Sequence, residues 1–289
     1  MFIINPISGR TTGRLNVPTL LEQLLDKQRY NPTVILTEYP GHATEIAQQA
    51  AAEGVSVVCA VGGDGTVNEV ARGLLQTNAS LAILPRGSGN GLARHLGIPL
   101  NLNQAIAILN QGQRSAIDSA TINEHPFFCT AGIGFDAHIS SVFAANTKRG
   151  LQTYVKLVLQ EFFRFKPLQA TLRLNQQQLE TNFFVLAFGN ASQYGNNAYI
   201  APMADIRDGL LDVCLIRHLN VRKAIALSYG LITKRLATSG HAEYFTSRDI
   251  EVQGEQALPF HADGEFMGKA TTFKVKILPL SLHVIVPTE

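Results

Sequence analysis

The segment Gly62-Gly63-Asp64-Gly65-Thr66 has the residue types of a phosphate-binding turn. It follows the apolar run 57–61 and precedes residues with a helical pattern. Glycines accept positive φ and let a phosphate come close to the backbone, and the first turn of a helix offers N–H groups and a positive dipole end. Asp64 would repel a polyphosphate unless its carboxylate binds Mg²⁺ or accepts a hydrogen bond from the nucleotide. The segment alone is also compatible with an ordinary tight turn between a strand and a helix.

The residues after this turn predict a helix from Thr66 to Leu75. Thr66 can cap the helix with its hydroxyl. Glu69, three residues later, can close a capping box by accepting a backbone N–H.

Two more loops have the same character. The loop 85–91 leaves an apolar strand for a helical stretch, and it offers a phosphate its amides, the Ser88 hydroxyl and the Arg86 guanidinium. The third loop follows the first apolar run and reads Asn5-Pro6-Ile7-Ser8-Gly9-Arg10. The carboxyl ends of parallel strands meet at one edge of a sheet, where open α/β sheets bind ligands, so the loops together predict a ligand site. Arg10, Arg14 and Arg86 are candidate phosphate contacts, and no GxxxxGK[ST] segment is present.

The elements that carry these loops alternate between strand and helix. This order predicts a parallel sheet with helices on both faces. The expected strands are 2–4, 33–36, 55–61 and 81–84, and the expected helices are 18–28, 43–52 and 66–75.

After about Asp118 the pattern changes to short strand-like runs separated by turns such as Asp208-Gly209 and Asp263-Gly264. These runs predict an antiparallel β-sandwich or barrel, interrupted by helices near 152–165 and 221–236. We therefore expect an α/β nucleotide-binding domain over 1–118 and a β-sandwich domain over 119–280. The last strand, 281–289, could return to the first domain.

Composition excludes several classes of protein. With 46% hydrophobic and 16% charged residues the chain can bury a large core, which argues against disorder. A net charge of +2 gives no reason to expect a nucleic-acid partner. The three cysteines are isolated in apolar runs, which argues against zinc and fits a reducing cytoplasm. The histidines, among them His261, show no metal-ligand spacing, and the segment 132–137 is interpreted as a structural turn although it fits G-x-G-x-x-A.

The ordered set of motifs resembles the diacylglycerol kinase catalytic-domain family, which includes bacterial soluble lipid kinases and relatives acting on sphingosine and ceramide. The resemblance runs nearly end to end. It rests on Asn5-Pro6-x-Ser8-Gly9, Thr37, Gly62-Gly63-Asp64-Gly65-Thr66-x-Asn68-Glu69, Leu84-Pro85-x-Gly87-Ser88-x-Asn90, Gly132-x-Gly134-Phe135-Asp136, Asp208-Gly209-Leu210 and Asp263-Gly264-Glu265.

The resemblance implies a Rossmann-like first domain, a β-sandwich second domain and an ATP site in the cleft between them. It implies that Glu265 is the general base, with Asp64 orienting the metal or the acceptor. It implies a structural Mg²⁺ held by Asp208 and by the backbone oxygens of Asp205 and Leu210. The positions that would bind ATP are Asn5, Ser8, Gly9, Thr37, Gly63, Asp64, Gly65, Thr66, Val67, Asn68, Glu69 and Ser88.

The expected reaction is therefore ATP-dependent phosphorylation of a lipid hydroxyl. The favoured acceptor is diacylglycerol, whose phosphorylation gives phosphatidic acid. The Gly87-Ser88-Gly89-Asn90 form looks more like the sphingosine kinase branch, so a sphingosine or ceramide acceptor stays open. Two other classes also stay open: an NAD kinase-like enzyme, which shares the Gly-Gly-Asp-Gly loop, and a non-catalytic module that binds nucleotide or lipid.

A lipid acceptor implies a cytoplasmic protein that works at the inner face of the membrane. The helix 152–165 is apolar and surrounded by Lys148, Arg149, Lys156, Arg164 and Lys166, which suits either an anionic bilayer or packing on the sandwich. The oligomeric state stays open, a homodimer included.

Overall fold

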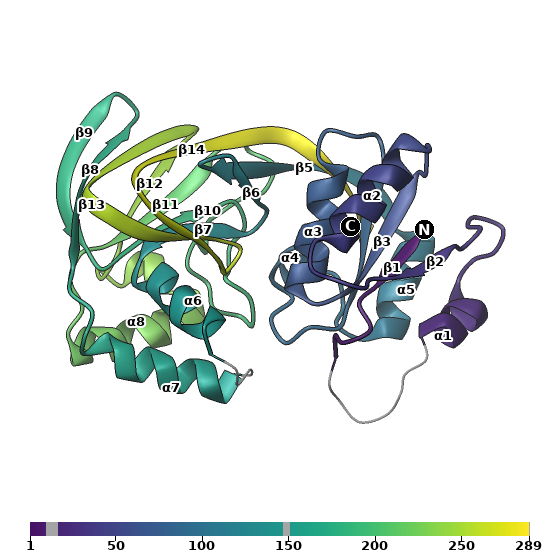
Figure 1. Ribbon diagram of the computed structural model, residues 1–289, viewed down its shortest axis with the longest axis horizontal. Helices are drawn as coiled ribbons and strands as arrows, with labels where there is room; N and C mark the ends of the chain where they lie inside the picture. The colour runs from purple at the N-terminus through teal and green to yellow at the C-terminus, as the bar shows by residue number, and fades with distance from the viewer. Residues whose placement is uncertain (10–16, 147–150, 289) are drawn as a thin grey trace. The chain divides into compact units, whose positions relative to one another are not determined.

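The computed structural model describes residues 1–9, 17–146 and 151–288, and side chains within 151–154 are outside that description. Arg10, Arg14, Lys148 and Arg149, which the sequence singled out, lie outside the described residues. The chain divides into two compact units (Figure 1). The first contains residues 1–118 and 279–289, and the second contains residues 119–278.

The first unit is built on a parallel sheet with the strand order β2-β1-β3-β4-β14. The two central strands, β3 and β4, are almost completely buried, as their continuous apolar sequences predict. The strands of this sheet are β1 (Phe2–Ile4), β2 (Val34–Leu36), β3 (Val57–Gly62), β4 (Ser80–Pro85) and the end of β14 (Glu265–Val286). The helices are α1 (Val17–Leu24), α2 (His42–Ala52), α3 (Asp64–Leu74), α4 (Gly91–His95) and α5 (Leu102–Gln111).

The last strand of the chain closes this sheet. In β14, His283 and Val284 pair in parallel with Ser80 and Leu81 of β4. The backbone N–H of Leu280 donates to Asp118 Oδ1 at 2.7 Å, so the chain is fastened where it re-enters the unit. The end of β14 therefore belongs to the first unit, a possibility that the sequence left open.

The second unit consists of antiparallel strands in the order β12-β11-β10-β7-β13-β14. The long strand β13 shifts register between Gln253 and Leu258, so that its first half pairs with β8 and its second half with β7. The strands are β5 (Gln113–Ile122), β6 (His125–Phe127), β7 (Thr130–Gly134), β8 (Leu168–Leu174), β9 (Gln177–Phe183), β10 (Val185–Gly189), β11 (Leu211–Ile216), β12 (Glu243–Ser247) and β13 (Asp249–Ala262).

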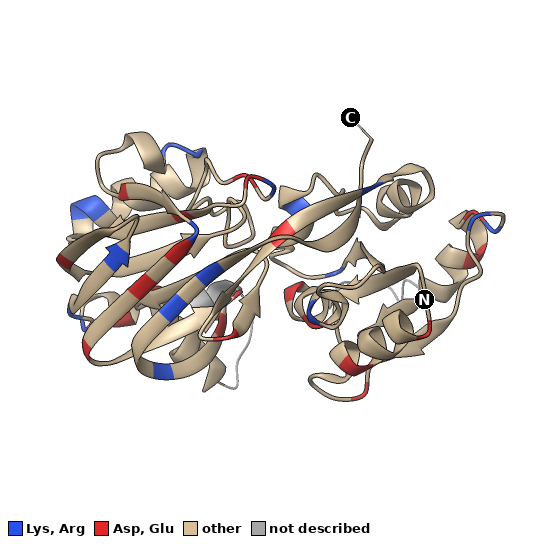
Figure 2. Ribbon diagram, turned by 90° about the horizontal axis from the view of Figure 1, so that it is seen from above, with Lys and Arg blue, Asp and Glu red and all other residues tan. Residues whose placement is uncertain are grey.

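This antiparallel sheet has differently composed faces. Alternate residues of β13 and β14 enter an apolar core that includes Val252, Phe273 and Val275. The residues between them are charged and pair across the strands, Asp249 with Lys276 and Glu251 with Lys274 (Figure 2). A second apolar cluster lies under the helices α6 (Phe135–Ala144), α7 (Leu151–Phe162), α8 (Val221–Thr233) and the short helix η1 (Leu236–Thr238). The predicted fold class, an α/β domain and a mostly antiparallel β domain, is confirmed.

Helices α2 and α3 approach each other more closely than side chains would allow at one point. A Cβ atom at Gly73 of α3 would lie 2.6 Å from Ala47 Cβ and 2.6 Å from the Thr44 carbonyl oxygen of α2. Glycine in a helix ordinarily costs about 1 kcal/mol relative to alanine, so its presence here reflects packing.

We expect Gly73→Ala to lower the free energy of unfolding by about 1–3 kcal/mol, because overpacking outweighs the gain in helix propensity. Urea denaturation of the purified variant measures this. Gln48→Ala, at an exposed position of α2, is the control and should change stability little. A stabilised Gly73→Ala variant would contradict the close packing.

Candidate active site

Two of the predicted loops are joined by the carboxylate of Asp64. Its Oδ2 accepts the backbone N–H of Asn90 at 2.9 Å, and its Oδ1 accepts the N–H of Gly91 at 2.7 Å. Asp64 is the first residue of α3, so the negative charge also lies at the positive end of that helix dipole. The carboxylate therefore fixes the loop 85–91 against the start of α3.

The predicted capping box is wrong. Helix α3 begins at Asp64, two residues earlier than expected, and its N-cap residue Gly63 has no capping side chain. Thr66 is buried inside the first turn. Glu69 reaches away from the helix start, and its Oε2 accepts the N–H of Ala43 in α2 at 3.2 Å.

The glycines of the two loops are required by close contacts. A Cβ atom at Gly87 would lie 2.7 Å from Gly63 Cα, and one at Gly89 would lie 2.6 Å from Asp64 Oδ2. Asn90 adopts the left-handed conformation with φ 52°, and its side chain bonds both the N–H and the carbonyl of Gly87 at 3.0 and 2.8 Å. The loop 85–91 is therefore held by hydrogen bonds between its own residues, and Gly87 packs against the backbone of Gly63.

The loop 5–9 contacts both of the other loops. Asn5 Nδ2 donates to Thr66 Oγ1 at 3.2 Å, and Asn5 Oδ1 accepts the N–H of Ile7 at 3.0 Å. Gly9 has φ 81°, and a Cβ atom there would lie 3.2 Å from Arg86 Nε. Within the described residues, all three predicted loops thus come together at the carboxyl edge of the first unit's sheet. We call the residues 5–9, 62–66 and 85–91 the loop junction.

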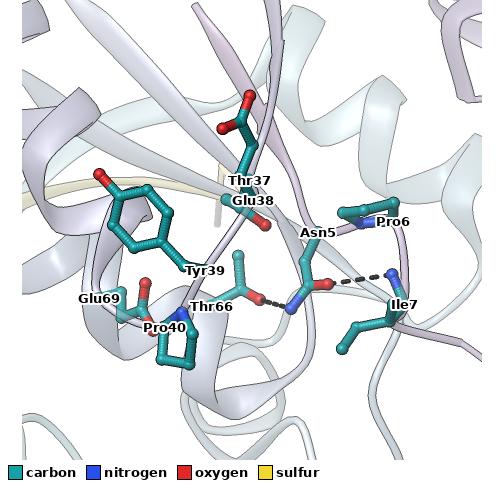
Figure 3. A pocket seen from close by; sticks show the side chains of 9 residues that line it. All are labelled: Asn5, Pro6, Ile7, Thr37, Glu38, Tyr39, Pro40, Thr66 and Glu69. Atoms are coloured by element: carbon teal, nitrogen blue, oxygen red, sulfur yellow. Dashed lines mark hydrogen bonds between the residues drawn. The ribbon is translucent and has the colours of Figure 1, made fainter.

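A pocket of about 210 Å³ opens beside the loop junction (Figure 3). Four of the predicted nucleotide-binding residues line it. The complete lining is Asn5, Pro6, Ile7, Thr37, Glu38, Tyr39, Pro40, Thr66 and Glu69.

The sequence reasoning missed the aromatic wall of this pocket. Tyr39 stacks on His42 with ring centroids 4.5 Å apart, and its hydroxyl donates to Glu45 at 2.7 Å. The signal was the position of Tyr39-Pro40, just after the strand end that carries Thr37. Of the other predicted positions, Asn68 and Val67 are buried in α3, while Ser88 is exposed in its loop.

The segment predicted to hold Mg²⁺ forms a turn before β11. Asp205 Oδ1 accepts the N–H of Arg207 at 3.0 Å, and Asp208 Oδ1 accepts the N–H of Leu210 at 2.9 Å. Asp212 is buried nearby, and its burial and the neighbouring Asp208 raise its pKa to about 6. Two adjacent carboxylates, one of them buried, are chemically suited to a hard cation. No group of three or more His, Cys, Asp or Glu side chains arranged for a metal occurs among residues 1–9, 17–146 and 151–288.

The predicted base lies on a tightly held hairpin of the second unit. Asp263 and Gly264 have φ of 47° and 82°, and Glu265 follows as the exposed first residue of β14. The Asp263 carboxylate accepts the backbone N–H groups of Phe128, Cys129 and Thr130 at 2.8, 2.8 and 3.0 Å. Asp263 is therefore a structural anchor that fixes the hairpin to the segment before β7.

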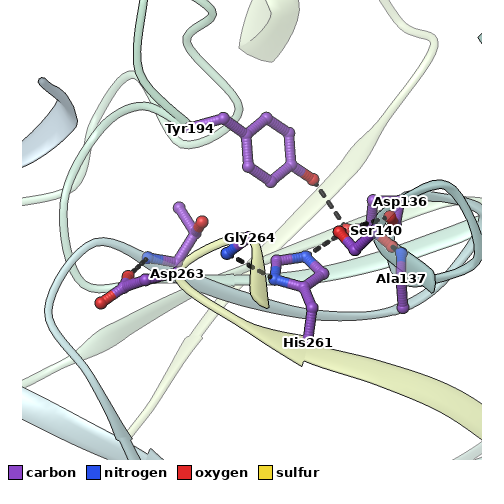
Figure 4. A network of polar contacts seen from close by, with 8 residues as sticks. Asp136, Ala137, Ser140, Tyr194, His261, Asp263 and Gly264 are labelled. Carbon is purple, nitrogen blue, oxygen red and sulfur yellow. Dashed lines mark hydrogen bonds and ion pairs between the residues drawn. The ribbon is translucent and has the colours of Figure 1, made fainter. Parts of the chain in front are cut away.

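A buried polar network supports the same hairpin from inside (Figure 4). The N–H of Gly264 donates to His261 Nδ1 at 3.3 Å, which leaves Nε2 to donate to Asp136 Oδ2 at 3.1 Å. The Tyr194 hydroxyl also donates to that oxygen, at 2.9 Å. A Cβ atom at Gly132 would lie 2.7 Å from His261 Nε2, so the glycine makes room for the pair. The segment 132–137 is the end of β7 and the start of α6, and Gly132 and Asp136 make structural contacts there. His261 is a core residue with a partner the sequence did not indicate.

Both parts of the chain match known protein families. Residues 1–122 match the diacylglycerol kinase catalytic domain, and residues 129–286 match the YegS C-terminal NAD kinase beta sandwich-like domain. A probable lipid kinase YegS-like protein of Chromohalobacter salexigens is 31% identical over 86% of this chain and 81% of its own. The chain belongs to the lipid kinase family that carries the diacylglycerol kinase catalytic domain. It is an enzyme of that class, as the motifs predicted.

Two further proteins are similar to this chain, one in sequence and one in fold. The diacylglycerol kinase of Bacillus subtilis is 25% identical over 99% of this chain and 96% of its own. The crystal structure of a putative diacylglycerol kinase from Bacillus anthracis matches with a TM-score of 0.80 over 99% of this chain and 94% of its own, at 21% identity, and therefore shows the shared fold.

We expect Asp64→Asn to destabilise this lipid kinase by about 1–3 kcal/mol, because an amide nitrogen would face a backbone N–H that now has a charged acceptor. Thermal unfolding measures the change. Asp26→Asn is the matched control, since the side chain of Asp26 accepts one backbone N–H, that of Gln28, in an exposed turn. Equal stability of the two variants would show that the Asp64 bonds do not hold the loops.

Proposed function

We propose that this lipid kinase transfers the γ-phosphate of ATP to the hydroxyl group of a diacylglycerol, giving phosphatidic acid. The loop junction is the observation that carries the proposal. It gathers glycine-bounded turns and the start of α3 beside a pocket of about 210 Å³. Such an arrangement suits the phosphates of a nucleotide, because backbone N–H groups and a helix dipole can face them without side chains in the way.

In this proposal the nucleotide contacts come from the loop junction and its neighbours. Thr37 and Thr66 line the pocket, and Asn5 orients the Thr66 hydroxyl. Residues 63–69 and Ser88 supply the remaining contacts, with Ser8 and Gly9 completing the site. Asp64 keeps a narrower role in this proposal, as a positioning residue: both of its oxygens hold the loop 85–91, and it acts on the reaction through that loop.

Glu265 is proposed as the general base. Its carboxylate takes the proton of the lipid hydroxyl while the hydroxyl oxygen bonds to the γ-phosphorus. The bond from that phosphorus to the bridging oxygen breaks, and ADP leaves. Phosphoryl transfer depends mainly on positioning and charge neutralisation. The three bonds to Asp263 fix the hairpin and so serve the positioning of Glu265.

Mg²⁺ is the proposed metal, and when bound it neutralises phosphate charge or stabilises the fold. For the structural ion, Asp208 and the backbone oxygens of Asp205 and Leu210 are the proposed ligands. The buried Asp212 next to Asp208 supports this, since a cation would offset the cost of two neighbouring carboxylates.

The direct test is transfer of radioactive phosphate from ATP to diacylglycerol, sphingosine, ceramide and NAD, each presented separately, the lipids in detergent micelles. The proposal requires label in phosphatidic acid. Label in a sphingoid lipid alone would keep the reaction and replace the acceptor, whereas label in NADP alone, or in no acceptor, would overturn the proposal.

We expect Glu265→Gln to reduce kcat by about 10²–10⁴-fold, because the amide cannot accept the hydroxyl proton. ATP affinity, measured by calorimetry, should stay unchanged. Glu255→Gln is the matched control, since it makes the same charge change at an exposed position of β13. A kcat near that of the unsubstituted enzyme in Glu265→Gln would remove Glu265 as the base.

We expect millimolar MgCl₂ added after EDTA treatment to raise the melting temperature of the kinase, and Asp208→Asn to abolish the rise. Asp249→Asn, an exposed carboxylate of the same unit, should keep it. An equal Mg²⁺ effect in both variants would place the ion elsewhere.

A further inference from the structure

Helix α8 exposes a continuous row of large apolar side chains. Val221, Ile225, Tyr229 and Ile232 follow one another at helical spacing, and they are 50, 68, 61 and 69% exposed. The opposite side of the helix is buried, where Leu227 and Leu231 join the apolar cluster under the sheet. Helix α8 therefore has two apolar sides: one packs against the apolar cluster under the sheet, and the other is exposed.

Helix α7 has the same construction. Val155 and Leu159 within the helix and Phe163 just after it are 47, 61 and 74% exposed. Its inner side packs on the same apolar cluster as α8, through residues that include Val158 and Phe162. The packing expected for this helix is thus present, and it leaves an outward apolar side uncovered. Both helices lie on one side of the second unit's sheet (Figure 1). We call the seven exposed residues of α7 and α8 the outer apolar face.

The exposed charged residues next to the outer apolar face in the sequence are basic. From His218 to Ala242 the sequence contains no Asp or Glu, and it contains Arg222, Lys223, Lys234 and Arg235, all exposed. Around α7, Lys156, Arg164 and Lys166 are exposed. The acidic residue of α7, Glu161, pairs with His138 at 2.8 Å and with Arg164 at 3.4 Å. Apolar side chains with a basic border are the composition of helices that lie in the interface of an anionic membrane.

We propose that the outer apolar face is a membrane-docking surface, on which α8 and α7 place their apolar side chains among the headgroups of anionic lipids. The choice of a bilayer as the partner rests on the proposed function, since a diacylglycerol acceptor resides in one. None of the helices in the described part of the chain has the length and apolarity of a bilayer span.

The charge pattern favours lipid over a second copy of the chain. In a two-fold symmetric dimer the same patch meets itself, so Arg222 and Lys223 would be brought toward the basic residues of the other copy. An anionic bilayer instead offers opposite charge to every basic residue on the border.

Sedimentation with vesicles tests the proposal in the intact enzyme. Vesicles of phosphatidylcholine with about one third phosphatidylglycerol should bind the protein, and phosphatidylcholine alone should bind it far less. Arg222→Glu/Lys223→Glu should weaken binding by at least about 30-fold, since each basic residue near an anionic surface contributes roughly fivefold. Ile225→Ser/Ile232→Ser should weaken it at least about tenfold, because exposed apolar area is lost from the contact.

Each variant has a matched control. Lys27→Glu/Lys274→Glu makes the same charge change at exposed positions elsewhere, and Met203→Ser removes an exposed apolar side chain outside both helices. Both controls should bind like the unsubstituted enzyme. Equal weakening by the controls, or no binding by the unsubstituted enzyme, would overturn the proposal, as would a dimer that Ile225→Ser/Ile232→Ser dissociates.

A fluorescent reporter gives an independent measurement, because the chain contains no tryptophan. Tyr229→Trp should show a blue shift and reduced acrylamide quenching when anionic vesicles are added, whereas Met203→Trp should show neither. An unchanged Tyr229→Trp spectrum with vesicle-bound protein would place the docking surface elsewhere.

Phosphate transfer to diacylglycerol in detergent micelles separates this proposal from the proposed function. Transfer in micelles without vesicle binding would contradict the docking surface and leave the function intact. Vesicle binding that depends on α8, without transfer to any lipid, would contradict the function and leave the docking surface intact.

Discussion

The two hydrogen bonds that Asp64 accepts from the backbone of Asn90 and Gly91 determine how the first unit presents its loops. A carboxylate at the start of one helix holds the start of the next, so two strand ends are fixed relative to each other. The absence of side chains at Gly63, Gly87 and Gly89 then lets the turns touch. Asn5 adds the third loop through Thr66. The turns of the junction are therefore held in place by internal hydrogen bonds before any ligand arrives, which reduces the cost of ordering them on binding.

In the second unit, too, an aspartate holds a turn by accepting backbone N–H groups. Asp263 accepts three backbone N–H groups, and the buried pair of His261 and Asp136 holds the adjacent Gly264. The hairpin that carries Glu265 is thus fixed on both sides. In each unit an aspartate of a glycine-containing motif, Asp64 or Asp263, accepts backbone N–H groups of a neighbouring segment. These hydrogen bonds give both residues a structural role that does not depend on any part in the reaction.

The fold class and the family could be predicted because the glycine-bounded loops and the change of pattern near Asp118 are local signals in the sequence. The partners of individual side chains could not. Glu69 has the spacing of a capping box with Thr66, yet it bonds Ala43, which is far away in the sequence. Nothing in the sequence indicated a partner for His261 in β13, because that partner, Asp136, lies far away in the sequence at the start of α6. Tyr39 lines the pocket only because the sheet order brings β2 beside β1. The roles of Glu265, Asp208 and the nucleotide-binding residues remain predictions from the family motifs.

Amide hydrogen exchange with and without MgATP tests the central claim, that the loop junction binds the nucleotide phosphates. Residues 62–66 and 85–91 should exchange more slowly when MgATP is bound, while the turn around Lys27 in the same unit should not change. Unchanged exchange in the loop junction, under conditions where calorimetry shows ATP to be bound, would contradict the account.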